Sequence, residues 1–438
     1  MKVAVIGTGY VGLVSGACFA DFGHTVTCVD KDASKIDRLH QGIMPIYEPG
    51  LDTLVASNVD EGRLFFTTEA KDAIAEADAV FIAVGTPSRR GDGHADLSFV
   101  YAVAEEIADL MDGFTVVVTK STVPVGTGDE VEEIIRKKCP NGDFAVVSNP
   151  EFLREGAAIK DFKIPDRVVV GTDDERAKDL MRELYRPLFL NETPILFTNR
   201  RTSELIKYAA NAFLAVKITF INEMADLCEK VGANVQEVSR GIGLDGRIGS
   251  KFLNAGPGYG GSCFPKDTLA LTKTANDYDS PVRIVDTVVE VNAARKKAMA
   301  DKVIQAMGGD VSGKTIGVLG LAFKQNTDDM RDAPSLDILP ILTAAGAKVK
   351  AFDPEAMDEA KHLLEDIEYA GNAYEAAEQA DALVIITEWD QFRALDLKRV
   401  KDAMTGNVLV DLRNIYTPAD AGKYGFAYTS IGRATELA

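Results

Sequence analysis

Short runs of apolar residues alternate with longer, helix-like segments along the first 200 residues of the chain. The runs have the length of buried β-strands and lie at residues 2–6, 25–29, 79–84, 115–119, 145–148 and 167–170. Strands that alternate with helices form parallel sheets, because each helical crossover returns the chain to the same edge. The pattern therefore predicts an α/β fold with a doubly wound parallel sheet.

A different pattern fills residues 202–231, where no strand-like run occurs. Apolar residues recur there at steps of three and four, at Leu205, Ala209, Ala212, Val216, Phe220, Met224, Leu227 and Val231. This spacing predicts one long amphipathic helix. We expect residues 201–300 to form a helical central domain and a dimer interface, because a helix of this length usually has partners on more than one side.

Strand-like runs return in the last third of the chain, at residues 314–319, 348–352, 382–387 and 407–411. The sequence Ala-Asp-Ala-Val-Phe-Ile at residues 77–82 is echoed by Ala-Asp-Ala-Leu-Val-Ile at residues 380–385. This weak repeat suggests two related nucleotide-binding folds. We therefore predict two Rossmann-like domains, at residues 1–200 and 301–438, joined by the helical domain at residues 201–300.

Composition and charge narrow the classes of function. The 438 residues are 46% hydrophobic and 26% charged, as in ordinary globular proteins, and the formal net charge is −19. An acidic chain is a poor partner for nucleic acid or an anionic membrane surface, and no run reaches the ~18 apolar residues of a membrane span. Five scattered cysteines without a C-x-x-C pair argue against a disulfide scaffold, so we expect a cytoplasmic location.

Glycines follow the first strand at a spacing typical of dinucleotide-binding proteins. Gly7, Gly9 and Gly12 form a G-x-G-x-x-G turn that opens a helix, where free N–H groups and the helix dipole favour a pyrophosphate. Asp30 ends the second strand, where a carboxylate can accept both ribose hydroxyls and would repel a 2′-phosphate. The arrangement predicts NAD rather than NADP, the alternative being glycines that merely make a tight turn.

The second Rossmann-like segment lacks this fingerprint, since Gly317 and Gly320 are followed by Leu-Ala-Phe and then Lys324. A lysine at the mouth of a strand-to-helix turn can still meet a phosphate. We expect this domain to bind a different nucleotide, with a solvated surface lysine as the alternative.

The glycine-rich stretch at residues 256–267, Gly-Pro-Gly-Tyr-Gly-Gly-Ser-Cys-Phe-Pro-Lys-Asp, is the most informative. Its glycines permit close approach of the backbone to a ligand, and Pro265 suits the first turn of a helix. Cys263 would then lie at a helix N-terminus beside Lys266, a setting that lowers the pKa of a thiol and favours the nucleophilic thiolate. The other four cysteines keep the ordinary interpretation of a buried, inert residue.

Other polar residues are weaker candidates. Lys207 and Asn211 are four apart on the predicted long helix, so they could together stabilise an oxyanion, or the lysine could act as acid or base. A solvated lysine at a helix edge is the alternative. Glu151 and Glu155 follow one buried strand and Thr122 follows another, at the edge where such sheets bind ligands. No metal site is expected, because no ligand spacing relates His24, His40, His94 and His362.

Seven ordered motifs resemble those of the nucleotide-sugar 6-dehydrogenase family, most closely its UDP-glucose branch. They are GTGYVG, VGTP, KSTVPVGT, NPEFLREG, SELIKYAANAFLA, FLNAGPGYGGSCFPKD and GLAFKQNTDDMRDAPS, and the likeness runs from residue 1 to about residue 414. The family architecture is an NAD-binding Rossmann domain, a helical dimerisation core and a UDP-binding Rossmann-like domain.

The reaction that this resemblance implies is a four-electron oxidation. The 6-hydroxymethyl group of a nucleotide sugar, UDP-glucose in that branch, becomes a carboxylate while two NAD and one water are consumed. Cys263 would trap the intermediate aldehyde as a thiohemiacetal, and a second hydride transfer would give a thioester that water hydrolyses. By the same resemblance Lys207 and Asn211 stabilise the oxyanions. Asp267, Thr122 and Glu151 organise the water and the proton transfers, and which residue is the general base stays open.

The resemblance also implies residues that contact the ligands. Around NAD they are Val11, Asp30, Lys35, Thr86, Thr122, Glu155, Lys266 and Arg331. Around the nucleotide sugar they are Glu151, Phe152, Leu153, Arg154, Lys207, Asn211, Phe252, Leu253, Asn254, Ala255, Gly256, Gly260 and Lys324. Arg247 resembles an arginine that the family inserts into the neighbouring subunit's site, so a homodimer would be needed for activity.

Several alternatives stay open at this point. Gln325 and Asp332 depart from the residues expected beside the nucleotide loop, which leaves the preference for base and sugar less secure. GDP-mannose 6-dehydrogenase shares the chemistry, whereas the loop fits N-acetylated UDP-hexosamine dehydrogenases less well. A simpler β-hydroxyacid dehydrogenase would need neither Cys263 nor a second nucleotide domain. The non-enzyme alternative is an NAD-dependent sensor or scaffold.

Overall fold

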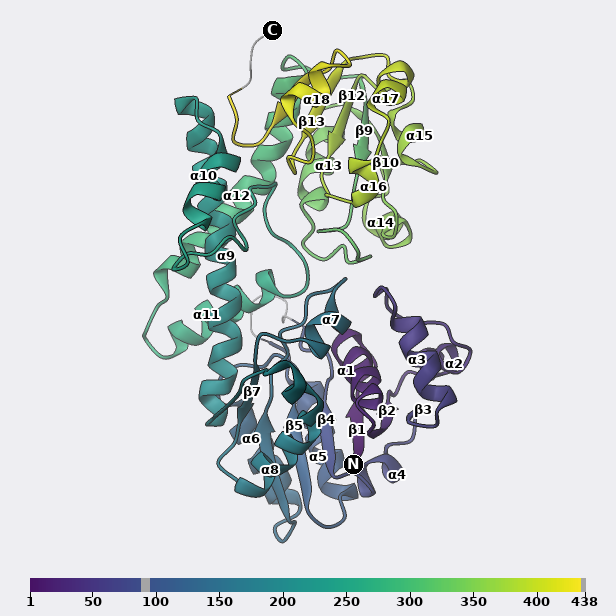
Figure 1. The fold of residues 1–438 in the computed structure, drawn as a ribbon, viewed down its shortest axis with the longest axis vertical. Helices are drawn as coiled ribbons and strands as arrows, with labels where there is room; N and C mark the ends of the chain where they lie inside the picture. Colours follow the sequence, from purple (N-terminus) through teal and green to yellow (C-terminus); the bar gives the residue numbers. More distant parts are fainter. Residues whose placement is uncertain (88–94, 435–438) are drawn as a thin grey trace. The chain divides into compact units, whose positions relative to one another are not determined.

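The computed structural model describes residues 1–87 and 95–434, which fold into two compact units (Figure 1). The first unit contains the described residues of 1–210 together with residues 273–279, and the second contains residues 211–272 and the described residues from 280 onward. The long helix α9, Arg200–Val231, confirms the predicted amphipathic helix and contributes residues to both units.

The first unit is built on an eight-stranded sheet in the order β3-β2-β1-β4-β5-β6-β7-β8. The strands are β1 Lys2–Ile6, β2 Thr25–Val29, β3 Leu64–Thr67, β4 Ala79–Ile82, β5 Thr115–Thr119, β6 Phe144–Ser148, β7 Val168–Gly171 and β8 Ile195–Thr198. The helices between them are α1 Tyr10–Asp21, α2 Ala33–His40, α3 Leu51–Asp60, α4 Ala70–Ala75, α5 Ser98–Leu110, α6 Thr127–Lys138, α7 Ala158–Lys163, α8 Glu175–Leu184 and the 3-10 helix η1 Arg186–Asn191.

Helices cover both faces of this sheet, and the strand β1 shows why. Val3 and Val5 belong to the apolar core that also contains residues of α1, α3 and α8. Ala4 and Ile6 belong to the opposite core, which contains residues of α5 and α6. Because successive strand residues point to opposite faces, a strand buried on both faces is a continuous apolar run.

The sheet departs from the predicted parallel arrangement at β7. This strand meets β6 in antiparallel orientation, with Ser148 opposite Gly171, and Asn149 Nδ2 donates to Val169 O over 2.7 Å beside that pair. The connection from β6 contains only the six-residue helix α7. A helix of this length rises about 9 Å, too little to carry the chain back along the sheet for a parallel return.

The second unit contains a six-stranded parallel sheet in the order β11-β10-β9-β12-β13-β14. Its strands are β9 Thr315–Leu319, β10 Lys348–Phe352, β11 Glu368–Tyr369, β12 Ala382–Ile385, β13 Val408–Asp411 and β14 Ala427–Ser430. Its helices, apart from α9, are α10 Val235–Gly243, α11 Phe264–Asp277, α12 Arg283–Ala306, α13 Pro334–Ala344, α14 Met357–Leu363, α15 Ala373–Ala377, α16 Asp390–Arg393, α17 Leu397–Ala403 and α18 Pro418–Gly422. Residues 273–277 of α11 lie in the first unit.

The internal repeat occupies equivalent places in the two sheets. Residues 77–82 lead into β4, which pairs with β1, and residues 380–385 lead into β12, which pairs with β9. Asp78 Oδ2 accepts from Lys2 N, and Asp381 Oδ2 accepts from Thr315 N, each over 2.8 Å. The repeated aspartate therefore fixes the start of the first strand of each sheet. This shared contact supports the predicted relationship between the two folds.

Candidate active site

The turn after β1 has the form that a dinucleotide pyrophosphate needs. A Cβ on Gly7 would lie 2.6 Å from Ala83 O, and one on Gly12 would lie 1.9 Å from Gly7 O, so both positions require glycine. A Cβ on Gly9, which precedes α1, would meet nothing within 4 Å. The turn is thus tight on its inner side and open at Gly9, where the backbone can approach a ligand.

Asp30 lies at the end of β2 beside this turn. Its Oδ2 accepts hydrogen bonds from Thr8 N over 2.9 Å and from Thr8 Oγ1 over 2.7 Å, and Lys35 Nζ lies 3.7 Å away. Burial raises the pKa of Asp30, but hydrogen bonds from the Asp32 and Thr8 N–H groups and the Thr8 hydroxyl outweigh it, so the net shift is downward. The residues present therefore fit the ribose of NAD and disfavour a 2′-phosphate.

Glu151 and Lys207 form a buried ion pair. Lys207 Nζ donates to Glu151 Oε1 over 2.9 Å, and the two side chains are 3% and 4% exposed. Burial raises the pKa of Glu151, whereas the charge and the hydrogen bond of Lys207 lower it more, so the pKa is lowered overall. Lys207 also lies 5.4 Å from the centre of the Phe152 ring. The solvated lysine considered above is therefore excluded.

Lys120 is a second buried cation beside this pair, and the sequence analysis gave it no role. Its Nζ donates to Asn149 Oδ1 over 3.1 Å and to Tyr185 OH over 3.2 Å. Burial lowers the pKa of Lys120 to about 8. The charge of Lys120 also lowers the pKa of Glu151. A lysine directly after a buried strand was the signal that could have identified it.

Glu204, one turn before Lys207 on α9, anchors the loop that contains Thr122. Its carboxylate accepts from Gly126 N over 2.7 Å, Gly128 N over 2.8 Å and Ser148 Oγ over 2.9 Å. A cavity of about 10 Å³ is lined by Thr119, Ser121, Thr122, Val123, Ser148, Pro150, Glu204 and Lys207. A space of this size suits about one water molecule.

Glu48 connects the dinucleotide turn to the loop after β6, a role that the sequence did not suggest. Its carboxylate accepts from the Tyr10 hydroxyl, from Gly156 N over 2.7 Å and from Ala158 N over 2.8 Å. Elsewhere in the first unit, Thr86 Oγ1 donates to Thr122 O over 3.0 Å, and Arg154 is paired with Asp161 over 2.6 Å.

In the second unit, Cys263 directly precedes α11, as predicted. Its carbonyl oxygen accepts from Asp267 N over 2.8 Å, so it starts the hydrogen bonding of the helix. The sulfur lies 3.4 Å from Ser262 Oγ. The thiol is therefore at the end of the helix where unpaired N–H groups favour negative charge.

Asp267, one turn into α11, is buried and holds two of the predicted site residues. Asn211 Nδ2 donates to Asp267 Oδ2 over 2.6 Å, and Lys266 Nζ lies 3.1 Å from Asp267 Oδ1. The amide of Asn211 is thereby oriented by an acid, as the ammonium of Lys207 is oriented by Glu151.

The glycine loop before Cys263 is packed from several sides. A Cβ on Gly260 would lie 2.3 Å from Asp332 O, and one on Gly261, at φ +84°, would lie 2.7 Å from the Phe323 ring. Gly261 N also donates to Arg331 O over 2.8 Å. The loop that contains Phe323 and Arg331 thus fixes the backbone two residues before the thiol.

Arg413 is a cation beside the predicted sugar-binding loop that the sequence analysis missed. Its Nη2 donates to Phe323 O over 2.9 Å, and a Cβ on Gly256 would lie 3.1 Å from its Nη1. Lys324 Nζ lies 5.1 Å from the centre of the Phe323 ring. Arg247 lies in a turn after α10, paired with Asp245 over 2.6 Å and with its side chain 89% exposed.

The turn after β9 shares one contact with the turn after β1 and has one more of the same kind. Asp353, at the end of β10 and fully buried, accepts from Leu321 N over 2.7 Å and from Ala322 N over 3.1 Å. Trp389 Nε1 donates to the same oxygen over 3.2 Å. Leu321 N corresponds to Thr8 N, which Asp30 accepts in the first turn, so Ala322 N is the additional donor that the carboxylate takes here. Ala322 stands where the first turn has Gly9.

Two expectations concern features that the sequence suggested were absent. Among the described residues, no group of three His, Cys, Asp or Glu side chains is arranged to hold a metal ion, and His94 lies outside them. None of the described helices combines the length and apolar character needed to cross a bilayer.

Three family models match the chain in order. Residues 1–189 match the NAD-binding domain, residues 201–294 the central domain and residues 317–418 the UDP-binding domain of the UDP-glucose/GDP-mannose dehydrogenase family. The UDP-glucose 6-dehydrogenase of Rhizobium meliloti (strain 1021) is 68% identical over 99% of this chain and 100% of its own. The UDP-glucose 6-dehydrogenase TuaD of Bacillus subtilis (strain 168) is 49% identical over 99% of this chain and 93% of its own. The solved structure of a UDP-glucose dehydrogenase from Pyrobaculum islandicum has a TM-score of 0.90 and 38% sequence identity. The match covers 99% of this chain and 98% of the other.

Proposed function

The chain belongs to the UDP-glucose/GDP-mannose dehydrogenase family, and from that premise we propose that it oxidises UDP-glucose to UDP-glucuronate. The balanced reaction consumes one UDP-glucose, two NAD and one water, and yields UDP-glucuronate, two NADH and three protons. The observation that carries the proposal is Cys263 at the start of α11, next to the loop held by Phe323 and Arg331. A full-length relative of 68% identity with this activity in its name supports the choice of substrate.

Cys263 is the proposed nucleophile. After the first hydride leaves C6, its thiolate adds to the aldehyde carbon and forms a thiohemiacetal. Loss of a second hydride gives a thioester, and attack of water on the thioester carbonyl releases the carboxylate and restores the thiolate. Each step places negative charge on an oxygen, so the site needs fixed donors.

Lys207 and Asn211 are the proposed donors to that oxygen. Glu151 holds the ammonium of Lys207 and Asp267 holds the amide of Asn211, both in buried hydrogen bonds. Donors oriented in advance stabilise a developing charge without reorganisation. Glu151, Asp267 and Thr122 are the proposed groups that organise the water and the proton transfers.

NAD, when bound, supplies the hydride acceptor in both oxidations. We assign its pyrophosphate to the Gly7, Gly9 and Gly12 turn and its ribose to Asp30, and Lys35 lies beside that carboxylate. The remaining proposed contacts are Val11, Thr86, Thr122, Glu155, Lys266 and Arg331.

The proposed nucleotide-sugar contacts lie in two groups of residues. The loop after β6 and the loop at residues 252–256 carry most of the polar and backbone groups of the proposed site. Lys324 and Gly260 belong to sequence motifs that the UDP-binding and central family models cover. The three-domain division at residues 1–200, 201–300 and 301–438 remains a proposal.

We propose a homodimer whose interface includes α9. Four apolar residues on its second-unit part, Phe213, Phe220, Leu227 and Val231, are 64%, 47%, 51% and 65% exposed. Steps of seven, seven and four residues place them along one stripe, and an exposed apolar stripe of this kind marks an interaction surface. Arg247 is the proposed residue that enters the partner's site. The five free cysteines support a reducing, cytoplasmic location.

The test is the amount of NADH formed per UDP-glucose consumed, for the wild type and for Cys263→Ser, with GDP-mannose measured in parallel. We expect two NADH per UDP-glucose from the wild type and a variant that stalls before free acid appears. One NADH per sugar, or an unimpaired variant, would contradict the thioester route. Faster turnover of GDP-mannose would replace the substrate but not the mechanism, and no NADH with either sugar would favour a sensor or scaffold.

A further inference from the structure

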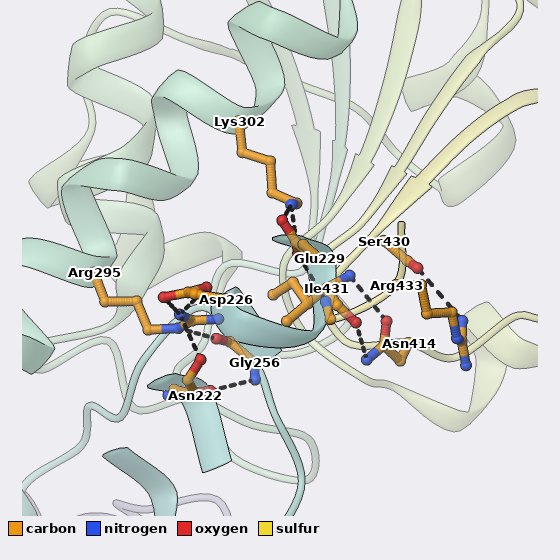
Figure 2. Close-up of polar contacts among 11 residues, drawn as sticks. Asn222, Asp226, Glu229, Gly256, Arg295, Lys302, Asn414, Ser430, Ile431 and Arg433 are labelled. Atoms are coloured by element: carbon orange, nitrogen blue, oxygen red, sulfur yellow. Dashed lines mark hydrogen bonds and ion pairs between the residues drawn. The ribbon is translucent and has the colours of Figure 1, made fainter. Parts of the chain in front are cut away.

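Arg295, on α12, is a buried residue at the centre of a polar cluster that joins the predicted sugar-binding loop to two helices (Figure 2), and its acidic partner Asp226 is 61% exposed. Its Nε donates to Gly256 O over 2.7 Å, and its Nη1 donates to Asn222 O over 3.2 Å. The same Nη1 lies 2.9 Å from each carboxylate oxygen of Asp226. The side chain is 5% exposed, so Nε and Nη1 make their hydrogen bonds away from solvent, whereas Nη2 is buried without a hydrogen-bond partner among the described residues.

The loop is held on both sides of Gly256. Gly256 N donates to Asn222 Oδ1 over 2.9 Å, whereas Gly256 O accepts from Arg295. Asn222 and Asp226 are four residues apart on α9, so Arg295 reaches the loop with one nitrogen and α9 with another. The two peptide groups that flank Gly256 are therefore fixed to α9 and α12 together.

This fixation matters because the loop has few side chains with which to recognise a ligand. Ala255 can offer only its peptide N–H and C=O groups, and those of Gly256 are already held by Asn222 and Arg295. Phe252 adopts φ +64°, a conformation rare for residues with a side chain. Recognition by peptide groups depends directly on the position of the backbone. A misplacement of about 1 Å in an enzyme site can lower the efficiency of the enzyme about 100-fold.

We propose that Arg295 is a positioning residue that sets the backbone of residues 252–256 for binding of the nucleotide sugar. This inference rests on the proposed function. Arginine is required because its guanidinium presents several donors in a fixed plane, whereas a lysine has one nitrogen and cannot reach Gly256 O and Asp226 at once. Arg295 itself need not touch the substrate.

The chain offers a matched control on the same two helices. Lys302 lies two turns along α12 from Arg295, and its Nζ lies 2.7 and 2.8 Å from the two oxygens of Glu229 on α9. Glu229 also accepts from Gly432 N over 2.8 Å, and Figure 2 shows this pair apart from the loop. Loss of Lys302 removes an ion pair between α9 and α12 without touching Gly256.

The experiment compares the wild type, Arg295→Ala, Arg295→Lys and Lys302→Met by steady-state kinetics with UDP-glucose and NAD. We expect KM for UDP-glucose to rise about 10- to 100-fold in both Arg295 variants. KM for NAD should stay within about twofold, and Lys302→Met should resemble the wild type. Guanidinium ion at tens of millimolar should lower KM in Arg295→Ala and should not change it in Lys302→Met.

Other outcomes separate the two hypotheses. If the wild type forms no NADH, the proposed function fails, and titration of UDP-glucose into the NAD-free proteins then tests the inference by itself. If the wild type turns over and Lys302→Met shows the same rise in KM, Arg295 only holds the helices together and the inference is wrong. An unchanged KM for UDP-glucose in folded Arg295→Lys overturns it as well, which covers the case in which Arg295→Ala does not fold.

Discussion

Lys207 Nζ lies 2.9 Å from Glu151 Oε1, and almost no surface of either side chain is exposed to solvent. The lysine comes from α9 and the glutamate from the loop after β6, 56 residues apart in the chain. An ion pair at this depth is stable only while both partners are present, because a single buried charge has no compensation.

Lys207→Met should therefore destabilise the protein by roughly 3–5 kcal/mol at neutral pH. In the wild type the pKa of Glu151 is lowered, so the stabilisation from this group is present above its ordinary pKa and is lost only as the pH falls through the lowered value. In the variant, burial without the cation raises that pKa, so the destabilisation should shrink as the pH is lowered toward about 5. Urea unfolding at both pH values measures this. Equal destabilisation at both pH values would contradict the conclusion that Lys207 stabilises the charge of Glu151. Adding Glu151→Gln to Lys207→Met should restore part of the lost free energy of unfolding.

Lys120 gives a prediction of opposite pH dependence. Burial lowers its pKa from 10.5 to about 8 in the folded protein. Below pH 8 the folded state must hold a buried charge, so the free energy of unfolding from this group rises with pH between about 8 and 10.5, by on the order of 3 kcal/mol. Lys120→Met should remove this rise relative to the wild type. Lys31→Met, at an exposed lysine, is the control and should show the same rise in the free energy of unfolding as the wild type. If the rise persists in Lys120→Met, other groups cause it.

The glycine loop predicts a contrast between two glycine-to-alanine changes. Gly261→Ala introduces a Cβ against the Phe323 ring at a positive φ, so we expect a loss of about 1–3 kcal/mol together with slower turnover, because Cys263 follows two residues later. Gly241→Ala, in α10, meets nothing within 4 Å and should be neutral or stabilise by about 0.5–1 kcal/mol. Thermal unfolding and NADH formation measure both. Full activity in Gly261→Ala would mean that this packing does not position the thiol.

The proposed dimer can be tested on its apolar stripe. Phe220→Asp places a charge in the middle of the exposed face of α9 and should shift the protein from dimer to monomer in sedimentation equilibrium. Phe189→Asp makes the same change at another exposed phenylalanine, in η1, and should leave the dimer intact. If both variants keep the wild-type mass, the interface lies elsewhere.

Much of the fold could be predicted because most strands are buried on both faces. The apolar runs predicted β1, β2, β5 and β10 to the residue. The four strands that they did not predict, β3, β8, β11 and β14, are the edge strands of the two sheets. β11 has two residues and β14 is Ala-Tyr-Thr-Ser, so neither contains a long apolar run. β3 and β8 each contain three apolar residues in a row and were still missed, because edge strands are short and partly exposed and give a weaker signal.

The site divides in a similar way. The glycine turn, Asp30 and the helix start at Cys263 follow from local sequence, because each depends on neighbours a few residues away. Glu204, Arg295 and Arg413 could not be predicted, because their partners lie far along the chain, whereas the position of Lys120 directly after a buried strand was a usable signal. Arg295, for example, meets Gly256 across 39 residues. A single charged residue in a helix has the same sequence pattern whether it is buried or solvated.

Asp353 has a consequence for stoichiometry. The six strands of the second sheet have the same order as the first six strands of the first sheet, so a compound that recognises the phosphate-binding turn of such folds would have two equivalent places to bind if both turns were open. In both sheets a carboxylate receives the N–H group that follows the first glycine, but in the second sheet Asp353 also receives that of Ala322, which stands where the first turn has Gly9. A dinucleotide-mimicking dye should therefore saturate at one molecule per chain, and its displacement by NAD would count the first sheet alone.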